Sequence, residues 1–330
     1  MMLLEQGAGV VRILDAFWRG SVGTSSALIS GTLVRAVPLT VVGVGIAIAF
    51  RAGVFNIGGE GQLLAGAIAA TLTGLNMDAG PALTVLAALV MAAIAGAAWA
   101  GVAALLRARF GVLEVISTIM LNFIAANLVS YLVRGPMQEP THIYPQTELI
   151  APVARLPRLL PQTRLHAGAL IAVIIAIAAW WVMTRTAAGF RLRAAGASAS
   201  AARTAGRIDV SRVAAMALLT SGAFAGLAGG IEVAGVTFGL YENLSPGYGF
   251  SAIAVAILGR LHPLAILGSA FVFAALETGA LGMQRDAGVP SVVASAIEAM
   301  AILLVVGAGA WSRWMPRRSV GARVSADGAA

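Results

Sequence analysis

Apolar stretches long enough to cross a lipid bilayer recur along nearly the whole chain. They lie at 33–50, 57–77, 82–106, 112–133, 166–184, 212–235, 248–260, 264–282 and 290–310. The chain is 59% hydrophobic and 11% charged, which leaves too few polar side chains to cover a soluble globule of this length. The sequence predicts an all-α membrane protein, a polytopic helical bundle of about 8–9 transmembrane segments with some broken or short helices.

The residue types that the chain lacks exclude several functions. All 22 of its basic side chains are arginine, whereas a P-loop needs a lysine for the nucleotide phosphates. Any ATP and Mg²⁺ must therefore be bound by a partner chain, and no cofactor of its own is expected. With no cysteine and three scattered histidines, we expect no metal site and no catalytic residues. The net charge of +8 follows from arginines in cytoplasmic loops, so no nucleic-acid partner is predicted.

Arginine placement predicts the orientation in the bilayer. An arginine cluster occupies 185–211, and such a cluster between two spans is typical of a cytoplasmic loop. Alternation then places the tail, 313–330, inside and the proline-rich loop 134–165 outside. Residues 28–312 form the predicted transmembrane domain.

The same alternation places residues 1–27 on the outer side. Their mixture of apolar and charged side chains is typical of a helix lying on the membrane surface, so this segment is predicted to be interfacial. Arg12 and Arg19 oppose the transfer of a free N-terminus. We expect either a translocated N-terminus or a functional protein that begins upstream of Met1.

Polar and glycine residues interrupt the start of the second apolar stretch. Asn56, Glu60 and Gln62 stand among four glycines, which do not favour a regular helix. Irregular backbone at membrane depth persists only where it is buried in protein or lines a wet cavity. The stretch is interpreted either as a broken helix lining a transport path or as a cytoplasmic turn that permits close helix packing.

A second polar group lies on one face of the span 112–133. At helical spacing, Glu114, Ser117, Thr118 and Asn122 share this face, which is expected to point into the bundle. Glu114 and Asn122 are candidates for the transport path. The alternative is that the face holds helices together by hydrogen bonds, with Glu114 solvated or paired with Arg107 or Arg109.

A third stretch lies in the predicted cytoplasmic loop, from Gly189 to Arg207. Ser198 can cap a short helix that runs through Ala205 and ends at Gly206. A basic helix held between two spans suits the docking of a cytosolic partner. The alternative is an ordinary positive loop.

Further charges lie within the apolar stretches. Arg35 is expected to pair with one of the acids Glu232, Glu277 and Glu298, although the sequence does not say which. The polar loop 241–250 is interpreted either as the rim of an outer vestibule or as a simple connection. Pro38 and Pro263 are expected to kink or break their helices.

Three motifs, FRAGVFNIGGEGQLLAG (50–66), LEVISTIMLNFIA (113–125) and GFRLRAAGASASAARTAGRIDVSR (189–212), resemble the permease subunits of ATP-binding-cassette (ABC) importers. The closest branch is the simple-sugar and nucleoside permeases, related to the ribose and branched-chain amino acid permeases. The resemblance covers about residues 28–312. Members usually carry one more N-terminal span.

The resemblance implies a permease in the bacterial plasma membrane. Its expected partners are ABC ATPase subunits, a second permease chain and an extracytoplasmic solute-binding lipoprotein. It implies that 185–211 is the coupling loop that seats in the ATPase, and that Asn56, Glu60 and Gln62 lie near the central path. The coupling residues by this resemblance are Gly189, Arg191, Arg193, Gly196, Arg203 and Gly206. The rival interpretation is an ion-coupled secondary transporter of small polar solutes that uses Glu60, Glu277 or Glu298.

Overall fold

Helices make up all the regular secondary structure of the described part of the chain. The computed structural model describes residues 9–204 and 206–290, together with 292, 293, 296, 299, 300, 303, 304 and 307. The elements in order are α2 (Val10–Ser21), η1 (Ala27–Thr32), α3 (Leu33–Arg51), α4 (Gly59–Asn76), α5 (Pro81–Phe110), α6 (Glu114–Arg134), η2 (Pro152–Ala154), α7 (Gly168–Arg185), α8 (Ala187–Ala197), α9 (Ala199–Thr204), α10 (Val210–Glu232), η3 (Val233–Thr237), α11 (Tyr248–Leu258) and α12 (Pro263–Ala287). The predicted all-helical class is confirmed for these residues.

Within the described residues, six helical segments are long and apolar enough to cross a membrane. They are Ala27–Arg51, Pro81–Phe110, Glu114–Arg134, Gly168–Arg185, Val210–Thr237 and Pro263–Ala287. Each coincides with a predicted span. Of the other three, 57–77 corresponds to α4, 248–260 corresponds to the short helix α11, and 290–310 lies largely outside the described residues. The predicted count of eight to nine is therefore not confirmed.

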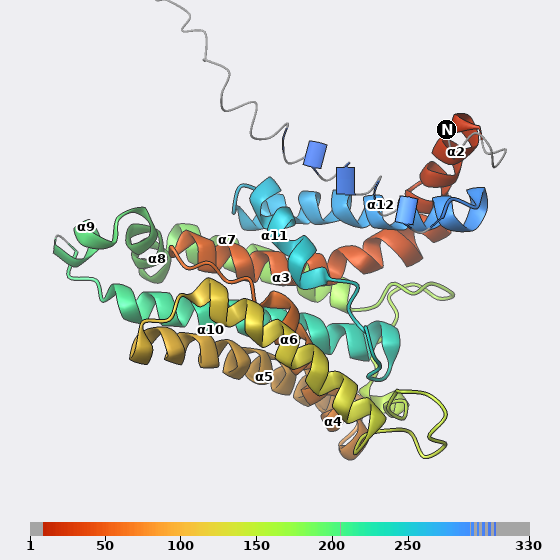
Figure 1. Ribbon diagram of the computed structural model, residues 1–330, viewed down its shortest axis with the longest axis horizontal. Coiled ribbons are helices and arrows are strands. Elements are labelled where there is room, and N and C mark those ends of the chain that lie inside the picture. The colour runs from red at the N-terminus through yellow and green to blue at the C-terminus, as the bar shows by residue number, and fades with distance from the viewer. Residues whose placement is uncertain are drawn as a thin grey trace, which may run out of the picture.

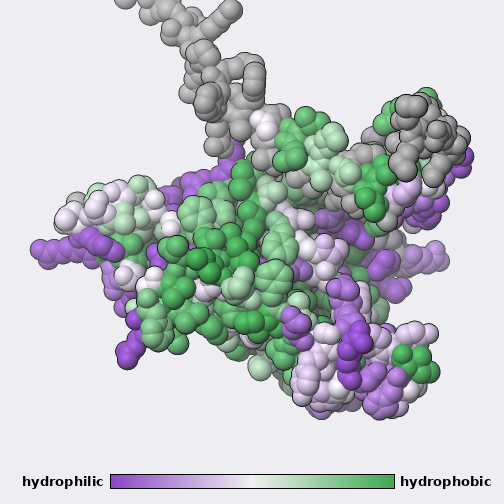
Figure 2. Space-filling model, viewed as in Figure 1, coloured by the Kyte–Doolittle hydropathy of each residue, from purple (hydrophilic) through white to green (hydrophobic). Residues whose placement is uncertain are grey.

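The long helices lie roughly side by side and leave loops at two opposite ends (Figure 1). Helices α8 and α9 occupy one end, and the loop 134–165 and α2 lie at the other. A hydrophobic band covers the middle of the molecule between more hydrophilic ends (Figure 2). This arrangement matches a membrane bundle in which the arginine-rich loop and the proline-rich loop face opposite sides.

Small residues allow α4, α5 and α10 to pack backbone against backbone. A Cβ atom added at Gly66 would lie 2.1 Å from the carbonyl oxygen of Gly226, and one added at Gly96 would lie 2.3 Å from that of Gly222. Close approach through glycine is the usual basis of helix association in lipid, where no hydrophobic force drives helices together. These contacts fix the centre of the bundle.

Helix α2 packs one face against the end of α12. Ile13 and Ala16 are buried against Ala280 and Met283, whereas Val11 and Trp18 are 81% and 59% exposed. An exposed apolar face on an amphipathic helix suits the predicted position at the membrane surface.

Neither proline breaks the helix that contains it, and a kink at Pro38 stays a prediction. Helix α3 continues through Pro38, directly after the π-helical turn η1. Pro263 is the first residue of α12, a position where the missing N–H costs no helical hydrogen bond.

Candidate translocation and coupling sites

The chain between α3 and α4 turns back into the bundle. Residues 52–58 are not helical, and α4 begins only at Gly59. A Cβ added at Gly59 would lie 3.2 Å from a side-chain methyl of Val42, in the middle of α3. Helix α4 therefore starts beside the middle of α3, and Gly59 and Gly61 in its first turn pack closely on α11 and α6, which the close-packing interpretation expected. That the stretch lines a transport path stays a prediction.

Asn56 holds this break by a closed set of hydrogen bonds. Its Nδ2 donates to Oε1 of Gln62 (2.9 Å) and to the hydroxyl of Ser221 (2.8 Å), and its Oδ1 accepts from Nε2 of Gln62 (3.0 Å) and the amide of Gly58 (2.9 Å). Asn56 and Gln62 are 0% and 1% exposed. A buried network with its partners satisfied rigidifies the segment that carries it.

Asn122 of α6 binds the same break from the other side. Its Oδ1 accepts from the amide of Gly61 (2.8 Å), and its Nδ2 donates to the carbonyl oxygen of Ile57 (2.9 Å). The polar face predicted for α6 is confirmed as buried at Ser117, Thr118 and Asn122. Sequence alone did not show that Asn122 contacts the glycine-rich stretch.

Replacement of Asn122 with alanine is expected to destabilise the protein. The amide of Gly61 and the carbonyl of Ile57 would both lose a buried partner, at a cost of about 1–3 kcal/mol for each unsatisfied group. The loss should appear as a lower melting temperature of the detergent-solubilised protein. Asn122→Asp keeps the acceptor for Gly61 but sets a carboxylate oxygen against the carbonyl oxygen of Ile57, so this variant should also melt at a lower temperature. Equal melting temperatures for Asn122→Ala and the native protein would contradict this role.

Glu60 lies where the N-termini of two helices meet. Its Oε2 accepts from the amide of Gly249 in the first turn of α11 at 2.7 Å. A Cβ added at Gly249 would lie 2.1 Å from the backbone nitrogen of Glu60, so the two backbones touch. The carboxylate is 9% exposed, and the free amides of a helix N-terminus stabilise a negative charge there. We call this contact of α4 and α11 the Glu60 junction.

Glu114 lies apart from the other four predicted path residues. It pairs with Arg107 at 3.0 Å, at the turn between α5 and α6. Asn56, Glu60, Gln62 and Asn122 gather around the break before α4. The structure thus brings four of the five residues together and places the fifth at the end of the bundle that also carries α8 and α9 (Figure 1).

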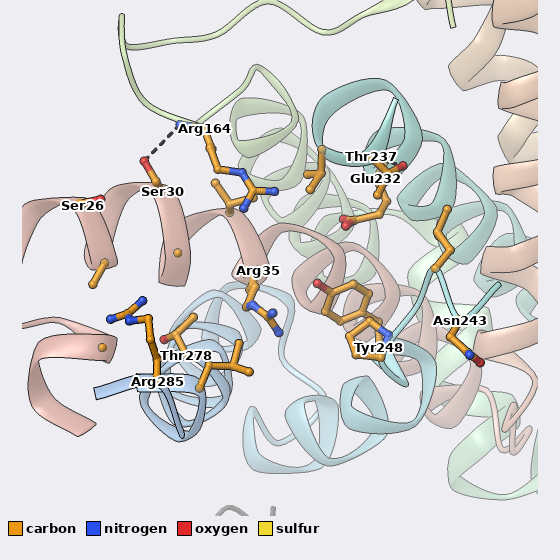
Figure 3. Close-up of a pocket in the computed structure, with 18 of the residues that line it drawn as sticks. Ser26, Ser30, Arg35, Arg164, Glu232, Thr237, Asn243, Tyr248, Thr278 and Arg285 are labelled. Carbon is orange, nitrogen blue, oxygen red and sulfur yellow. Dashed lines mark hydrogen bonds between the residues drawn. The ribbon is translucent and has the colours of Figure 1, made fainter. Parts of the chain in front are cut away.

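A cavity of about 940 Å³ opens beside α3, α10, α11 and α12. Arg35, Arg164, Glu232 and Tyr248 line it, and Figure 3 shows them converging on its centre from different elements. None of the five predicted path residues lines this cavity. From sequence, Glu232 is only an intramembrane acid and Tyr248 only part of an outer loop, because their shared location depends on the packing of distant helices.

The structure identifies the partner of Arg35. Its guanidinium donates to Oε2 of Glu277 at 3.3 Å, which forms a part-buried ion pair between α3 and α12. Of the other two acids considered, Glu232 makes no ion pair within the described residues, and Glu298 lies outside them.

The predicted coupling loop contains two helices instead of one. Ser198 caps α9 through its hydroxyl, which accepts from the amide of Ala201 at 3.3 Å. Helix α8 precedes it and begins where the hydroxyl of Thr186 accepts from the amide of Gly189 at 3.1 Å. The sequence predicted only the second of these helices. In α8, Gly189 packs on the carbonyl oxygen of Val182, where a Cβ would lie at 2.2 Å.

Gly196 joins α8 to the break before α4. A Cβ added at Gly196 would lie 2.1 Å from the carbonyl oxygen of Arg51, and one at Gly53 would lie 3.4 Å from the Cα of Gly196. The end of α8 therefore rests on the segment that leads to Asn56. Among the other predicted coupling residues, Arg203 is exposed on α9 and Arg193 is half-buried on α8.

A second cavity, of about 840 Å³, lies between α7, α8 and α10. Gly189, Arg191 and Gly206 line it together with apolar side chains of α7 and α10. Three of the six predicted coupling residues thus share one groove beside α8. Among the described residues, no three His, Asp or Glu side chains gather in a way that would hold a metal ion.

Glu242 ties the loop before α11 to the end of α6. Arg134 donates to both of its oxygens at 2.7 Å, and the hydroxyl of Ser130 donates to one of them. The hydrogen bonds from Arg134 and Ser130 lower the pKa of Glu242 from 4.5 to about 2.

This pKa predicts a pH-dependent contribution to stability. A carboxyl whose pKa is lowered by folding stabilises the protein above its unfolded pKa of 4.5, and the contribution is lost as the pH falls toward about 2. The native protein should therefore melt above Glu242→Gln at pH 7, and the difference should shrink below pH 4.5. A difference that is unchanged at pH 3 would contradict the assignment.

The comparisons with known proteins agree with this architecture. The model of the family described as the branched-chain amino acid transport system / permease component matches residues 28–307. A glucose ABC transporter permease protein of Haloferax volcanii is 39% identical over 302 residues, 88% of this chain and 79% of the relative. A guanosine ABC transporter permease protein of Bacillus subtilis is 37% identical over 311 residues, 92% of this chain and 88% of the relative. No solved structure gives a significant match.

Six apolar helices of membrane-spanning length within the described residues, together with these relatives, define a multi-pass membrane protein. The chain belongs to the family of branched-chain amino acid transport system permease components, and within it to the permeases of ABC importers of the simple-sugar and nucleoside type. Such permeases are transport components, not catalysts. Neither the fold nor the comparisons support the ion-coupled alternative.

Proposed function

We propose that this chain forms half of the translocation path of an ABC importer for nucleosides or simple sugars in a bacterial plasma membrane. A second permease chain completes the path, two ATPase subunits bind at α8 and α9, and a solute-binding lipoprotein delivers solute at the opposite end. ATP and Mg²⁺ bind in the ATPase partners. The relatives named for guanosine, glucose and nucleosides support these two solute classes.

The contact of Gly196 with the break before α4 is the observation that carries this proposal. If a cytosolic ATPase moves α8, the backbone of Gly196 displaces Arg51 and Gly53. The backbones are in contact there, so no space remains for α8 to move alone. The chain continues from there to Asn56, Glu60 and Gln62. One predicted coupling residue, Gly196, thus contacts the segment that leads to three of the predicted path residues.

This connection suits transport by alternating access. The hydrogen bonds of Asn56 and Asn122 hold the break as a rigid unit between α6 and α10. Movement of such a unit opens a path on one side while it closes the other, which broken helices achieve in many transporters. Helix α4 and the shorter helix α11, together with the six long helices and 290–310, make up the proposed set of eight or nine membrane segments.

Reconstitution in liposomes tests the proposal. The chain is expressed with a second permease, an ATPase and a solute-binding protein from the same organism, and uptake of labelled guanosine and glucose is measured. ATP-dependent accumulation of one of them is expected, together with copurification of the ATPase. Accumulation that follows a sodium or proton gradient and ignores ATP would overturn it.

A further inference from the structure

The 940 Å³ cavity lies next to the Glu60 junction. Tyr248, the first residue of α11, lines it, and the next residue, Gly249, donates to Glu60. The cavity continues from there toward the loop end of the bundle, where Arg164 of the loop 134–165 forms part of its wall. A solute that enters from this end reaches Tyr248 before it meets the break.

Two π-helical turns form opposite parts of the cavity wall. Ala27, Ser30 and Gly31 belong to η1, and Val236 and Thr237 belong to η3. Turns of this kind widen the helix and disturb its regular hydrogen bonds, and they are frequent at functional sites. Turn η1 begins the helix that continues as α3, and η3 forms the last turn after α10.

Glu232 points into the cavity without a partner. It is 5% exposed, and its carboxylate makes no hydrogen bond or ion pair with the described residues. Arg35 and Arg164 lie close enough to act on it electrostatically. In Figure 3 its carboxylate faces the guanidinium of Arg164 across the open space, with the ring of Tyr248 beside it.

A buried carboxylate is costly without hydrogen-bond donors, because desolvation disfavours its charge. Glu232 bears part of this cost, because no described residue donates to its carboxylate, which faces a cavity large enough for a small solute. Donors supplied by a solute would remove it. Tyr248, which is 4% exposed and whose hydroxyl is also without a partner in the described residues, offers an aromatic face and a second polar group.

We propose that the cavity between η1, η3 and α11 is a solute-binding site, in which Glu232 accepts hydrogen bonds from vicinal hydroxyl groups of a neutral polyhydroxylated solute and Tyr248 packs against its ring. This site rests on the proposed function and deepens it. It gives the solute a defined position within one permease chain, on the outer side of the Glu60 junction.

Charge selects the neutral class of solute. Arg35 is engaged by Glu277 and Arg285 by Asp286, so these cations are balanced within the protein. Of the charged side chains that line the cavity, the carboxylate of Glu232 and the guanidinium of Arg164 remain. Glu232 repels a solute with a net negative charge, and Arg164 repels one with a net positive charge. Hydroxyl groups can donate to Glu232 and accept from Arg164.

The absence of cysteine from the chain allows a direct binding test. Val236→Cys places a single thiol on the cavity wall, one turn from Glu232, and Ile143→Cys places one on the exposed loop at the same end. Maleimide labelling of the purified chain is measured with and without guanosine and glucose. We expect one of these solutes to slow labelling of Val236→Cys and to leave Ile143→Cys unchanged.

Glu232→Gln in the Val236→Cys background tests the role of the carboxylate. The amide removes a buried charge, so the variant should fold at least as well as the parent. The solute concentration that gives half-maximal protection is expected to rise about tenfold, as for a lost hydrogen bond to a charged group. Asp15→Asn, an exposed acid paired with Arg19, serves as the matched control and should leave protection unchanged.

The outcomes separate this site from the proposed function. Unchanged protection in Glu232→Gln, or protection of Val236→Cys by an anionic solute alone, would overturn the site while uptake by the native importer still stands. Protection without ATP-dependent uptake in the reconstituted complex would keep the site and overturn the importer. In the complex, Glu232→Gln should raise the KM for uptake about tenfold.

Discussion

Replacement of Gly226 with alanine is expected to destabilise the bundle strongly, because the added methyl group would meet the backbone of a neighbouring helix. The new Cβ would lie 2.3 Å from the carbonyl oxygen of Ala92, in a region where α4, α5 and α10 already touch through their backbones. Helix backbones cannot move aside as a side chain can, so α5 and α10 must separate. Overpacking of this kind costs about 1–3 kcal/mol or more.

The measurement is the melting temperature of the detergent-solubilised protein, with the yield of monodisperse protein as a second readout. Gly268→Ala is the matched control, because a Cβ at Gly268 in α12 meets nothing within 4 Å. It should melt with the native protein. Similar melting temperatures for Gly226→Ala and Gly268→Ala would show that the three helices are not packed as described.

Replacement of Gly196 with valine is expected to abolish uptake and to leave the permease folded. The side chain would press on the carbonyl oxygen of Arg51 and would shift α8 away from the break before α4. Gly196 is exposed at the end of α8, so α8 can shift without opening the buried centre of the bundle, and the melting temperature should fall less than in Gly226→Ala. ATP-dependent uptake should fall at least about tenfold, and solute should no longer stimulate the ATPase.

The neighbouring exposed residue provides the control. Ala197→Val adds similar bulk at the end of α8, and its uptake should stay close to native. Arg203→Glu, on the exposed surface of α9, should instead weaken copurification of the ATPase, which separates docking from transmission. Normal uptake by Gly196→Val would show that the coupling of α8 to Asn56 is not needed.

The sequence predicted those features that depend on local pattern. Six of the nine long apolar runs coincide with spans, and four glycines among Asn56, Glu60 and Gln62 indicated an irregular or closely packed entry to α4. Ser198 correctly indicated the start of α9. Each of these follows from residues within one turn or one loop, where hydrophobicity and capping act without help from distant segments.

Features that depend on distant contacts could not be predicted. The pairing of Arg35 with Glu277 spans 242 positions in sequence, and three acids were equally plausible partners. The cavity brings Glu232 and Tyr248 beside η1 only after three-dimensional packing. Helix α8 was missed for a related reason, because Gly189 and Gly196 are unfavourable in an isolated helix and become necessary once other backbones press on them.

The break before α4 also constrains the order in which the protein can be made. Asn56 needs the hydroxyl of Ser221, 165 residues later, and Gly66 rests on Gly226. During synthesis, Asn56 therefore lacks its partner Ser221, and α4 lacks its contact with Gly226, until α10 has entered the membrane. Because contacts so distant in sequence form late, the polar half of α4 is where an insertion chaperone or the translocon would be needed longest.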